Sequence, residues 1–189
     1  MTKKINLPNK LTIMRIILTP VAVFFMLWEW KYSPLFALAV FVAASVTDFF
    51  DGKIARSRNL VTDFGKFLDP IADKIIIISI LICMITKNLC SPVVVIIVIF
   101  REFIVSSLRL VAASRSIVLA AGIWGKVKTA SQMISVSAVL IFLSICAFKP
   151  LPFSVQTVSN VLMWINAAIA VFSGIDYLVK NGNLIDPCE

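Results

Sequence analysis

Histidine is absent from this chain, and it has only four cysteines, Cys83, Cys90, Cys146 and Cys188, with no C-x-x-C spacing. Protein zinc sites use Cys and His ligands, so a zinc site is not indicated, and the spacings do not indicate a disulfide framework either. We interpret the cysteines as apolar filler or as bystanders without a function. The chain also lacks a G-x-x-x-G motif, a low-complexity segment and a convincing internal repeat, which argues against a repeat architecture.

Charged residues are scarce as well. They make up 15% of the chain, against 60% hydrophobic residues, whereas soluble domains contain roughly 45–50% apolar residues. The composition therefore excludes an ordinary soluble domain and predicts an all-α integral membrane protein. A membrane span needs about 20 apolar residues, so 189 residues suit a single domain, residues 1–189, built as a bundle of about six transmembrane helices.

The apolar runs give the expected elements. An N-terminal interfacial helix opens near Leu7 and leads into a first span over 16–28, which ends at an aromatic anchor of Trp28, Trp30 and Tyr32. Further spans are expected from about 35 to the first acidic cluster, and over about 64–86, 92–113, 128–148 and 155–179. No small-residue cleavage site follows the first run, so we expect this span to be retained.

Basic residues outnumber acidic ones, 18 to 10, and the net charge is +8. They stand in short clusters between apolar runs, which is typical of the positive-inside rule rather than of nucleic-acid binding. The pattern predicts a multi-pass protein of the cell membrane, with both termini and the acidic cluster on the cytoplasmic side and Arg101 inside a span. Fourteen basic residues then lie inside (Lys3, Lys4, Lys10, Arg15, Lys53, Arg56, Arg58, Lys66, Lys74, Arg109, Arg115, Lys126, Lys128 and Lys180) and three outside (Lys31, Lys87 and Lys149).

Four carboxylates, Asp48, Asp51, Asp69 and Asp73, border segments that are otherwise apolar. An Asp at the bilayer centre costs about 2.5–3.5 kcal/mol on insertion scales, so four together need compensation. The spacings of three and four put each pair on one helix face, and two such faces packed together would form an all-oxygen pocket. Hard cations such as Mg²⁺ or Mn²⁺ prefer oxygen ligands, and two of them can clamp a phosphoryl group. Helix capping by charged residues would explain one or two of these acids, but not their joint spacing.

Small and basic residues accompany the acids. Gly52 and Ala55 leave room for a bulky ligand near the backbone, and Arg56 offers a forked donor to phosphate oxygens. With Gly65, the whole run reads D-x2-D-G-x2-A-R-x8-G-x3-D-x3-D, and in this it resembles the CDP-alcohol phosphotransferases.

The resemblance implies that family's fold and roles for these residues. Two divalent ions, Mg²⁺ or Mn²⁺, would be held by Asp48, Asp51 and Asp69 with help from Asp73. Asp73 would also take the proton from the attacking acceptor hydroxyl. The donor, CDP-diacylglycerol, would lie against Gly52, Ala55, Arg56 and Gly65, with Asn9 and Thr12 as weaker candidates by location.

A second polar group lies near the middle of the fourth expected span. Adjacent residues on a helix do not face each other, so Arg101 and Glu102 each need a partner elsewhere, and a structural polar network with other spans is one interpretation. Arg109, two turns further on, is a more credible anion ligand. The following loop ends with Lys126 and Lys128 near a helix start, where they fit either phosphate binding or ordinary positive-inside lysines.

Four further strings, L-P-N-x-L-T-x-x-R, L-D-P-x-A-D-K, R-E-x-x-x-S-x-L-R and G-K-x-K-T, resemble the family's bacterial branch whose acceptor is sn-glycerol 3-phosphate. The resemblance implies transfer of a phosphatidyl group from CDP-diacylglycerol to this acceptor, with CMP released, and a homodimer. Arg109, Lys126 and Lys128 would hold the acceptor phosphate.

Other functions stay open at this point. A sibling enzyme would use serine, an inositol phosphate or phosphatidylglycerol as its acceptor. A cation transporter would show discontinuous helices in paired inverted halves, and no such pairing is visible. A purely structural membrane subunit would not require four spaced acids.

Overall fold

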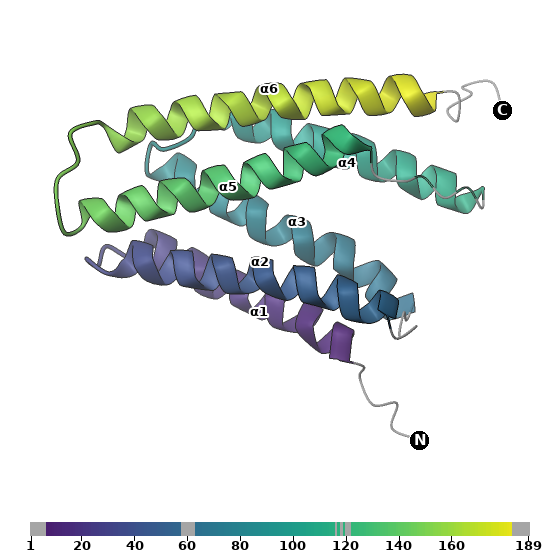
Figure 1. Cartoon of the computed structure of the whole chain (residues 1–189), viewed down its shortest axis with the longest axis horizontal. Coiled ribbons are helices and arrows are strands. Elements are labelled where there is room, and N and C mark those ends of the chain that lie inside the picture. The colour runs from purple at the N-terminus through teal and green to yellow at the C-terminus, as the bar shows by residue number, and fades with distance from the viewer. Residues whose placement is uncertain (1–6, 58–62, 116, 118, 120–121, 183–189) are drawn as a thin grey trace. The chain divides into compact units, whose positions relative to one another are not determined.

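The structure, a computed structural model, describes residues 7–57, 63–115, 117, 119 and 122–182, and it describes their side chains except at 7–8, 48–57, 63–67 and 69–70. Throughout these ranges the secondary structure is helical, without a strand. The all-α prediction is therefore confirmed (Figure 1). The helices are α1 (Leu7–Leu27), α2 (Ser33–Ser57), α3 (Asp63–Thr86), α4 (Pro92–Ser114), α5 (Ile123–Cys146) and α6 (Val155–Asn181).

Three of these helices are long and apolar enough to cross a membrane, judged over the described residues. They are α1 from Asn9, α5 and α6. The apolar part of α2, Ser33–Thr47, is shorter. A membrane-embedded helix satisfies all its interior backbone groups within its own ladder, which is why apolar spans take this form. The number of helices that span the membrane stays a prediction.

Two boundaries differ from the sequence prediction. A single helix, α1, covers both the expected interfacial helix and the first span without a break, and it continues through Pro20. The prediction that a loop runs up to the G-K-x-K-T string was wrong, because α5 begins at Ile123 and the string lies within its first turns. Gly125 lies inside the helix, although glycine has a low helix propensity.

The chain forms two compact units, Met1–Lys87 with Ser137–Pro152 and Asn88–Val136 with Phe153–Glu189. In the first unit α1 packs against α2 and α3 (Figure 1). Small residues line these contacts: Ala22, Ala37, Ala44 and Ala72 have no exposed surface. Small side chains let helix backbones approach closely, which is the main source of packing energy between apolar helices.

One end of the first unit is aromatic. Phe25 stacks on Phe36 with ring centroids 5.2 Å apart, and Trp28 contacts Trp30 at 5.4 Å. Lys31 lies over the Phe148 ring, its Nζ 5.0 Å from the centroid, in cation–π geometry. The aromatic cluster predicted around Trp28 is therefore present at the turn between α1 and α2.

In the second unit α4 packs against α6. The buried face of α4 carries Val98, Arg101, Val105 and Leu108 at helical spacing. Arg101 is therefore a buried charged residue on a helix face that is otherwise apolar. Val105 and Leu108 form a core cluster with Tyr177 of α6.

The two helices of this seam are also held at their other end. There the Ser159 hydroxyl of α6 donates a 2.6 Å hydrogen bond to the carbonyl of Leu89, just before α4. The α4–α6 seam is the scaffold of the polar site described below.

Candidate functional site

The predicted acidic site lies on α2 and α3. Asp48 and Asp51 belong to the last three turns of α2, and Asp69 and Asp73 to the first half of α3. Both segments are helical, as the spacing argument requires, so each pair shares a helix face. The end of α2 and the start of α3 lie at the same end of the first unit (Figure 1).

Of the predicted acidic-site residues, the structure describes the side chain of Asp73, which is half-buried on α3. The side chains of Asp48, Asp51, Gly52, Ala55, Arg56, Gly65 and Asp69 lie outside the described residues. The helical positions fit a cluster of hard oxygen ligands, since carboxylates at these spacings can converge on small cations. The metal ligation itself stays a prediction.

A buried polar face on α1 accompanies the acidic segments. Asn9, Thr12, Arg15 and Thr19 are all buried, and their spacing puts them within one side of the helix that packs against α2 and α3. The Thr19 hydroxyl donates to the Arg15 carbonyl at 3.0 Å. The sequence interpretation named Asn9 and Thr12 but gave Arg15 no role at a site. The sequence did contain a sign that Arg15 belongs to a site, because Arg15 is the last residue of the L-P-N-x-L-T-x-x-R string.

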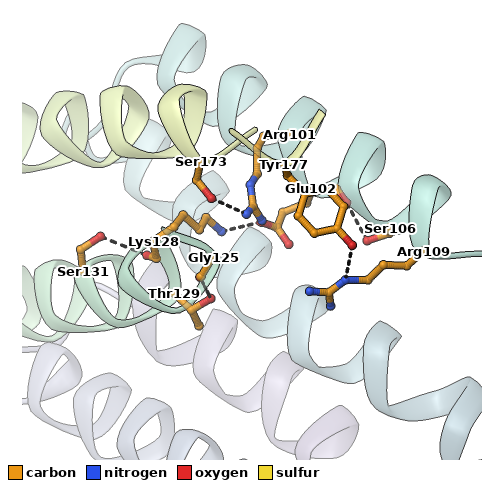
Figure 2. Close-up of polar contacts among 10 residues, drawn as sticks. All are labelled: Arg101, Glu102, Ser106, Arg109, Gly125, Lys128, Thr129, Ser131, Ser173 and Tyr177. Carbon is orange, nitrogen blue, oxygen red and sulfur yellow. Dashed lines mark hydrogen bonds and ion pairs between the residues drawn. The ribbon is translucent and has the colours of Figure 1, made fainter. Parts of the chain in front are cut away.

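The second unit holds a buried ionic network (Figure 2). One oxygen of Glu102, Oε1, accepts from Arg101 Nη1 at 2.8 Å and from Lys128 Nζ at 2.6 Å. Arg101 Nη2 donates in turn to Ser173 Oγ of α6 at 2.7 Å. These contacts join α4, α5 and α6 through charged groups. A buried charge is tolerated when it is paired and hydrogen-bonded, and both conditions hold for this carboxylate.

The structure corrects one expectation here. Arg101 and Glu102 were predicted not to face each other, yet their side chains form an ion pair. Adjacent residues of a helix have Cβ atoms that point in different directions. The arginine side chain is long enough to bend around the helix and reach the neighbouring carboxylate. The predicted partners on other helices are also present, in Lys128 and Ser173.

Two glycines make room for the arginine. A Cβ added at Gly174 of α6 would lie 3.2 Å from Arg101 Cγ, and one added at Gly125 of α5 would lie 3.7 Å from Arg101 Nη2. The second distance is an ordinary van der Waals contact, but the first is tighter than nine in ten real Cβ contacts. Arg101 thus lies between glycines of two neighbouring helices, and neither glycine had been assigned a role from the sequence.

The three predicted phosphate ligands lie in different surroundings. Lys128 is buried and points to Glu102, whereas Lys126, in the same helix, is exposed. Arg109 is exposed, its Nε donates to the Tyr177 hydroxyl at 3.2 Å, and its guanidinium lies 5.6 Å from the centre of that ring. Tyr177 therefore orients Arg109 (Figure 2). Sequence reasoning missed Tyr177 because it lies within an apolar helix.

Further polar groups join α5 to α6. Asn166 accepts from the Ser131 hydroxyl at 2.9 Å and donates to the Ser135 hydroxyl at 2.7 Å. Buried Gln132 lies one turn beyond Lys128, and its Nε2 has no hydrogen-bond partner among the described residues. The polar face of α5 thus runs from Gly125 to Ser135.

The chain was compared with known proteins. A profile of the family described as CDP-alcohol phosphatidyltransferase matches residues 5–172. Proteins named CDP-diacylglycerol–glycerol-3-phosphate 3-phosphatidyltransferase are similar to it along nearly the whole length. The one from Bacillus subtilis is 40% identical, covering 93% of this chain and 95% of its own. The one from Rickettsia felis is 36% identical, covering 91% and 93%, and the one from Haemophilus influenzae is 33% identical, covering 97% of both.

The glycine contact gives a stability prediction. In Gly174→Val the new side chain collides with Arg101, whose guanidinium is fixed by Ser173 and Glu102. Overpacking of this kind costs about 1–3 kcal/mol, and each kcal/mol lowers the Tm of a protein this size by roughly 2–4 °C. The measurement is thermal unfolding in detergent. Gly182→Val is the matched control, because nothing lies within 4 Å of a Cβ there. Equal Tm values for the two variants would contradict the close contact.

Proposed function

Because the chain belongs to the CDP-alcohol phosphatidyltransferase family, we propose that it transfers the phosphatidyl group of CDP-diacylglycerol to sn-glycerol 3-phosphate. The products are phosphatidylglycerophosphate and CMP. The observation that carries this proposal is the name shared by the relatives, which are 33–40% identical over at least 91% of the chain. The complete acidic motif on α2 and α3 supports the same chemistry.

The acidic residues are the proposed metal ligands. Asp48, Asp51 and Asp69, with Asp73, would hold two divalent ions, Mg²⁺ or Mn²⁺, through oxygen atoms alone. When bound, such ions neutralise the diphosphate and stabilise the charge that develops during displacement at phosphorus. Carboxylates are the ligands available at this position, since the chain has no histidine.

The proposed chemical step is a direct displacement. Asp73 accepts the proton of the acceptor hydroxyl, and the hydroxyl oxygen attacks the phosphorus that carries diacylglycerol. The bond from that phosphorus to the bridging oxygen breaks, and CMP leaves with the bonding electrons. Charge stabilisation and positioning supply most of the acceleration in phosphoryl transfers of this kind.

Donor binding is assigned to the residues that carry the family pattern. Gly52, Ala55 and Gly65 leave space beside the nucleotide, and Arg56 donates to phosphate oxygens. Asn9 and Thr12 add polar groups from the buried face of α1, which packs against the helices that bear the acids.

Acceptor binding is assigned to the basic residues of the second unit. Arg109, Lys126 and Lys128 provide positive charge for the acceptor phosphate. Two of them are held in defined directions, Lys128 by Glu102 and Arg109 by Tyr177. A phosphate is bound best by donors that lose little freedom on binding.

The protein is a membrane protein, as its three long apolar helices and its family indicate. We further propose that both termini and the acidic motif face the cytoplasm, because most basic residues fall on that side in a six-span arrangement. The family resemblance also favours a homodimer.

The first prediction for this function concerns the acids. Replacing Asp48, Asp51, Asp69 or Asp73 singly with Asn keeps the size of the side chain and removes its charge. Loss of groups that only support metal ligands costs about 10–100-fold in activity, so we expect each replacement to lower turnover more than about a hundredfold. CMP release in detergent micelles measures it, with Tm as the folding control. A variant with near-normal turnover at low metal would remove that residue from the site.

Metal dependence is the second test. Excess chelator should stop CMP release, and Mg²⁺ or Mn²⁺ should restore it. Zn²⁺ should restore it poorly, because the proposed shell has neither His nor Cys. Full activity in excess chelator would refute the metal cluster.

The third test concerns the acceptor. Arg109→Gln or Lys126→Gln should raise the KM for glycerol 3-phosphate roughly ten- to a hundredfold, since a charge-assisted hydrogen bond is worth about 1.5–3 kcal/mol. The KM for CDP-diacylglycerol should change much less. Lys149→Gln, in the exposed turn after α5, is the matched control.

The same assay tests the acceptor's identity. A panel of glycerol 3-phosphate, glycerol, serine, inositol phosphate and phosphatidylglycerol compares the sibling reactions directly. The named reaction would be wrong if glycerol or serine served as well as glycerol 3-phosphate.

A further inference from the structure

We propose that Glu102 is a positioning residue that holds the Lys128 ammonium in the direction needed for the acceptor phosphate. This inference rests on the proposed function, because it takes Lys128 as a phosphate ligand. It adds a role for an acidic residue outside the metal motif, at a position where a negative charge would otherwise oppose anion binding.

The first argument is the geometry of the shared oxygen. Glu102 Oε1 accepts from both Arg101 and Lys128, at 2.8 and 2.6 Å. A carboxylate whose only function was to neutralise one cation would need a single partner. Here Arg101 fixes the position of the Glu102 carboxylate, and the carboxylate fixes the Lys128 ammonium. Two residues of α4 therefore set the orientation of a side chain of α5 (Figure 2).

The second argument is burial. The side chains of Arg101, Glu102 and Lys128 are 9%, 14% and 5% exposed. A lysine stem has several rotatable bonds, and an exposed ammonium samples many positions. Lys126, two residues earlier in the same helix, is exposed, so the fixed position belongs to Lys128.

The third argument is the rigidity of the base. Arg101 is held by Ser173 at 2.7 Å and lies between Gly125 and Gly174. The backbone of Glu102 is also engaged, because its carbonyl accepts from the Ser106 hydroxyl at 2.6 Å. A positioning group works only if it is itself fixed, and here the fixing contacts come from α4, α5 and α6.

The fourth argument is the common face of α4. Glu102 and Arg109 are seven residues apart, so they share one helix face, about 10 Å apart along the axis. Glu102 therefore holds Lys128 on the face of α4 that presents Arg109. Both proposed phosphate ligands are thus directed by a neighbour, Lys128 by Glu102 and Arg109 by Tyr177.

The test is a double-mutant cycle on the full-length protein with glycerol 3-phosphate as the varied substrate. Glu102→Gln should raise the acceptor KM about tenfold and leave the CDP-diacylglycerol KM within about twofold, because a positioning role acts on one substrate. Lys128→Met should raise the acceptor KM at least as much. Adding Glu102→Gln to Lys128→Met should then change the acceptor KM by less than about twofold, since the lysine through which Glu102 acts is gone.

Two further variants keep the result interpretable. Glu102→Asp preserves the charge but withdraws the carboxylate from Lys128, so it should fold and still raise the acceptor KM. Asp176→Asn removes an acid of α6 that pairs with Lys180 outside the network, and it should leave both KM values unchanged.

The outcomes separate the two proposals. No CMP release by the wild-type protein with glycerol 3-phosphate would overturn the proposed function. Wild-type activity combined with an unchanged acceptor KM in Glu102→Asp, or with equal effects of Glu102→Gln in both backgrounds, would overturn the positioning role alone. An equal rise in both KM values would also overturn it, since that result indicates a general structural role.

Discussion

The cost of placing charge among apolar helices is the constraint on which this structure depends. A chain with 60% hydrophobic residues has few polar groups that can compensate an isolated ion. In the second unit, the Glu102 carboxylate pairs with two cations, Arg101 and Lys128, and Arg101 also donates to the Ser173 hydroxyl of α6. The ionic network thereby also links α4, α5 and α6, because α4 contributes Arg101 and Glu102, α5 contributes Lys128 and α6 contributes Ser173.

Small residues are the counterpart of these charges. Gly125 and Gly174 leave space for Arg101, and four alanines without exposed surface line the contacts of α1, α2 and α3. The hydrophobic effect drives helices together in soluble proteins, but it does not act between helices in lipid. There, van der Waals packing and hydrogen bonds between helices provide the attraction. The positions of glycine and alanine therefore determine where polar side chains can be enclosed.

Much of the helical order could be predicted from the sequence, because apolar runs and flanking Pro, Lys and Trp residues mark helix ends locally. Predicted starts at 64 and 92 agree with α3 and α4 to within one residue. The start of α5 could not be predicted in the same way, because Gly125 lies within the helix, beside the Arg101 guanidinium of α4. That is a tertiary fact, and a single sequence does not contain it.

The candidate sites divide in the same manner. The acidic motif is local, so its spacing alone predicts that each pair of aspartates shares a helix face, and α2 and α3 are helical there. The ionic network joins residues far apart in the chain. Its member on α6, Ser173, and the tyrosine that orients Arg109, Tyr177, both occur in a helix that looks apolar from its composition. The prediction that Arg101 and Glu102 do not face each other was wrong. Their Cβ atoms point in different directions, but the flexible side chains still meet in an ion pair.

The division between local and long-range features bears on specificity. In the proposed function the acidic motif acts on the diphosphate of the donor, which all the alternative acceptor reactions share, so the motif does not select an acceptor. Selection of the acceptor has to come from protein groups that contact the part of the alcohol that differs between the alternatives. An acceptor that carries a phosphate requires positive charge in a fixed geometry. A lysine oriented by a buried carboxylate and an arginine oriented by a tyrosine meet that requirement. If the proposed acceptor site is right, acceptor choice depends on tertiary contacts of α4, α5 and α6, and the acidic motif by itself is compatible with several alcohols.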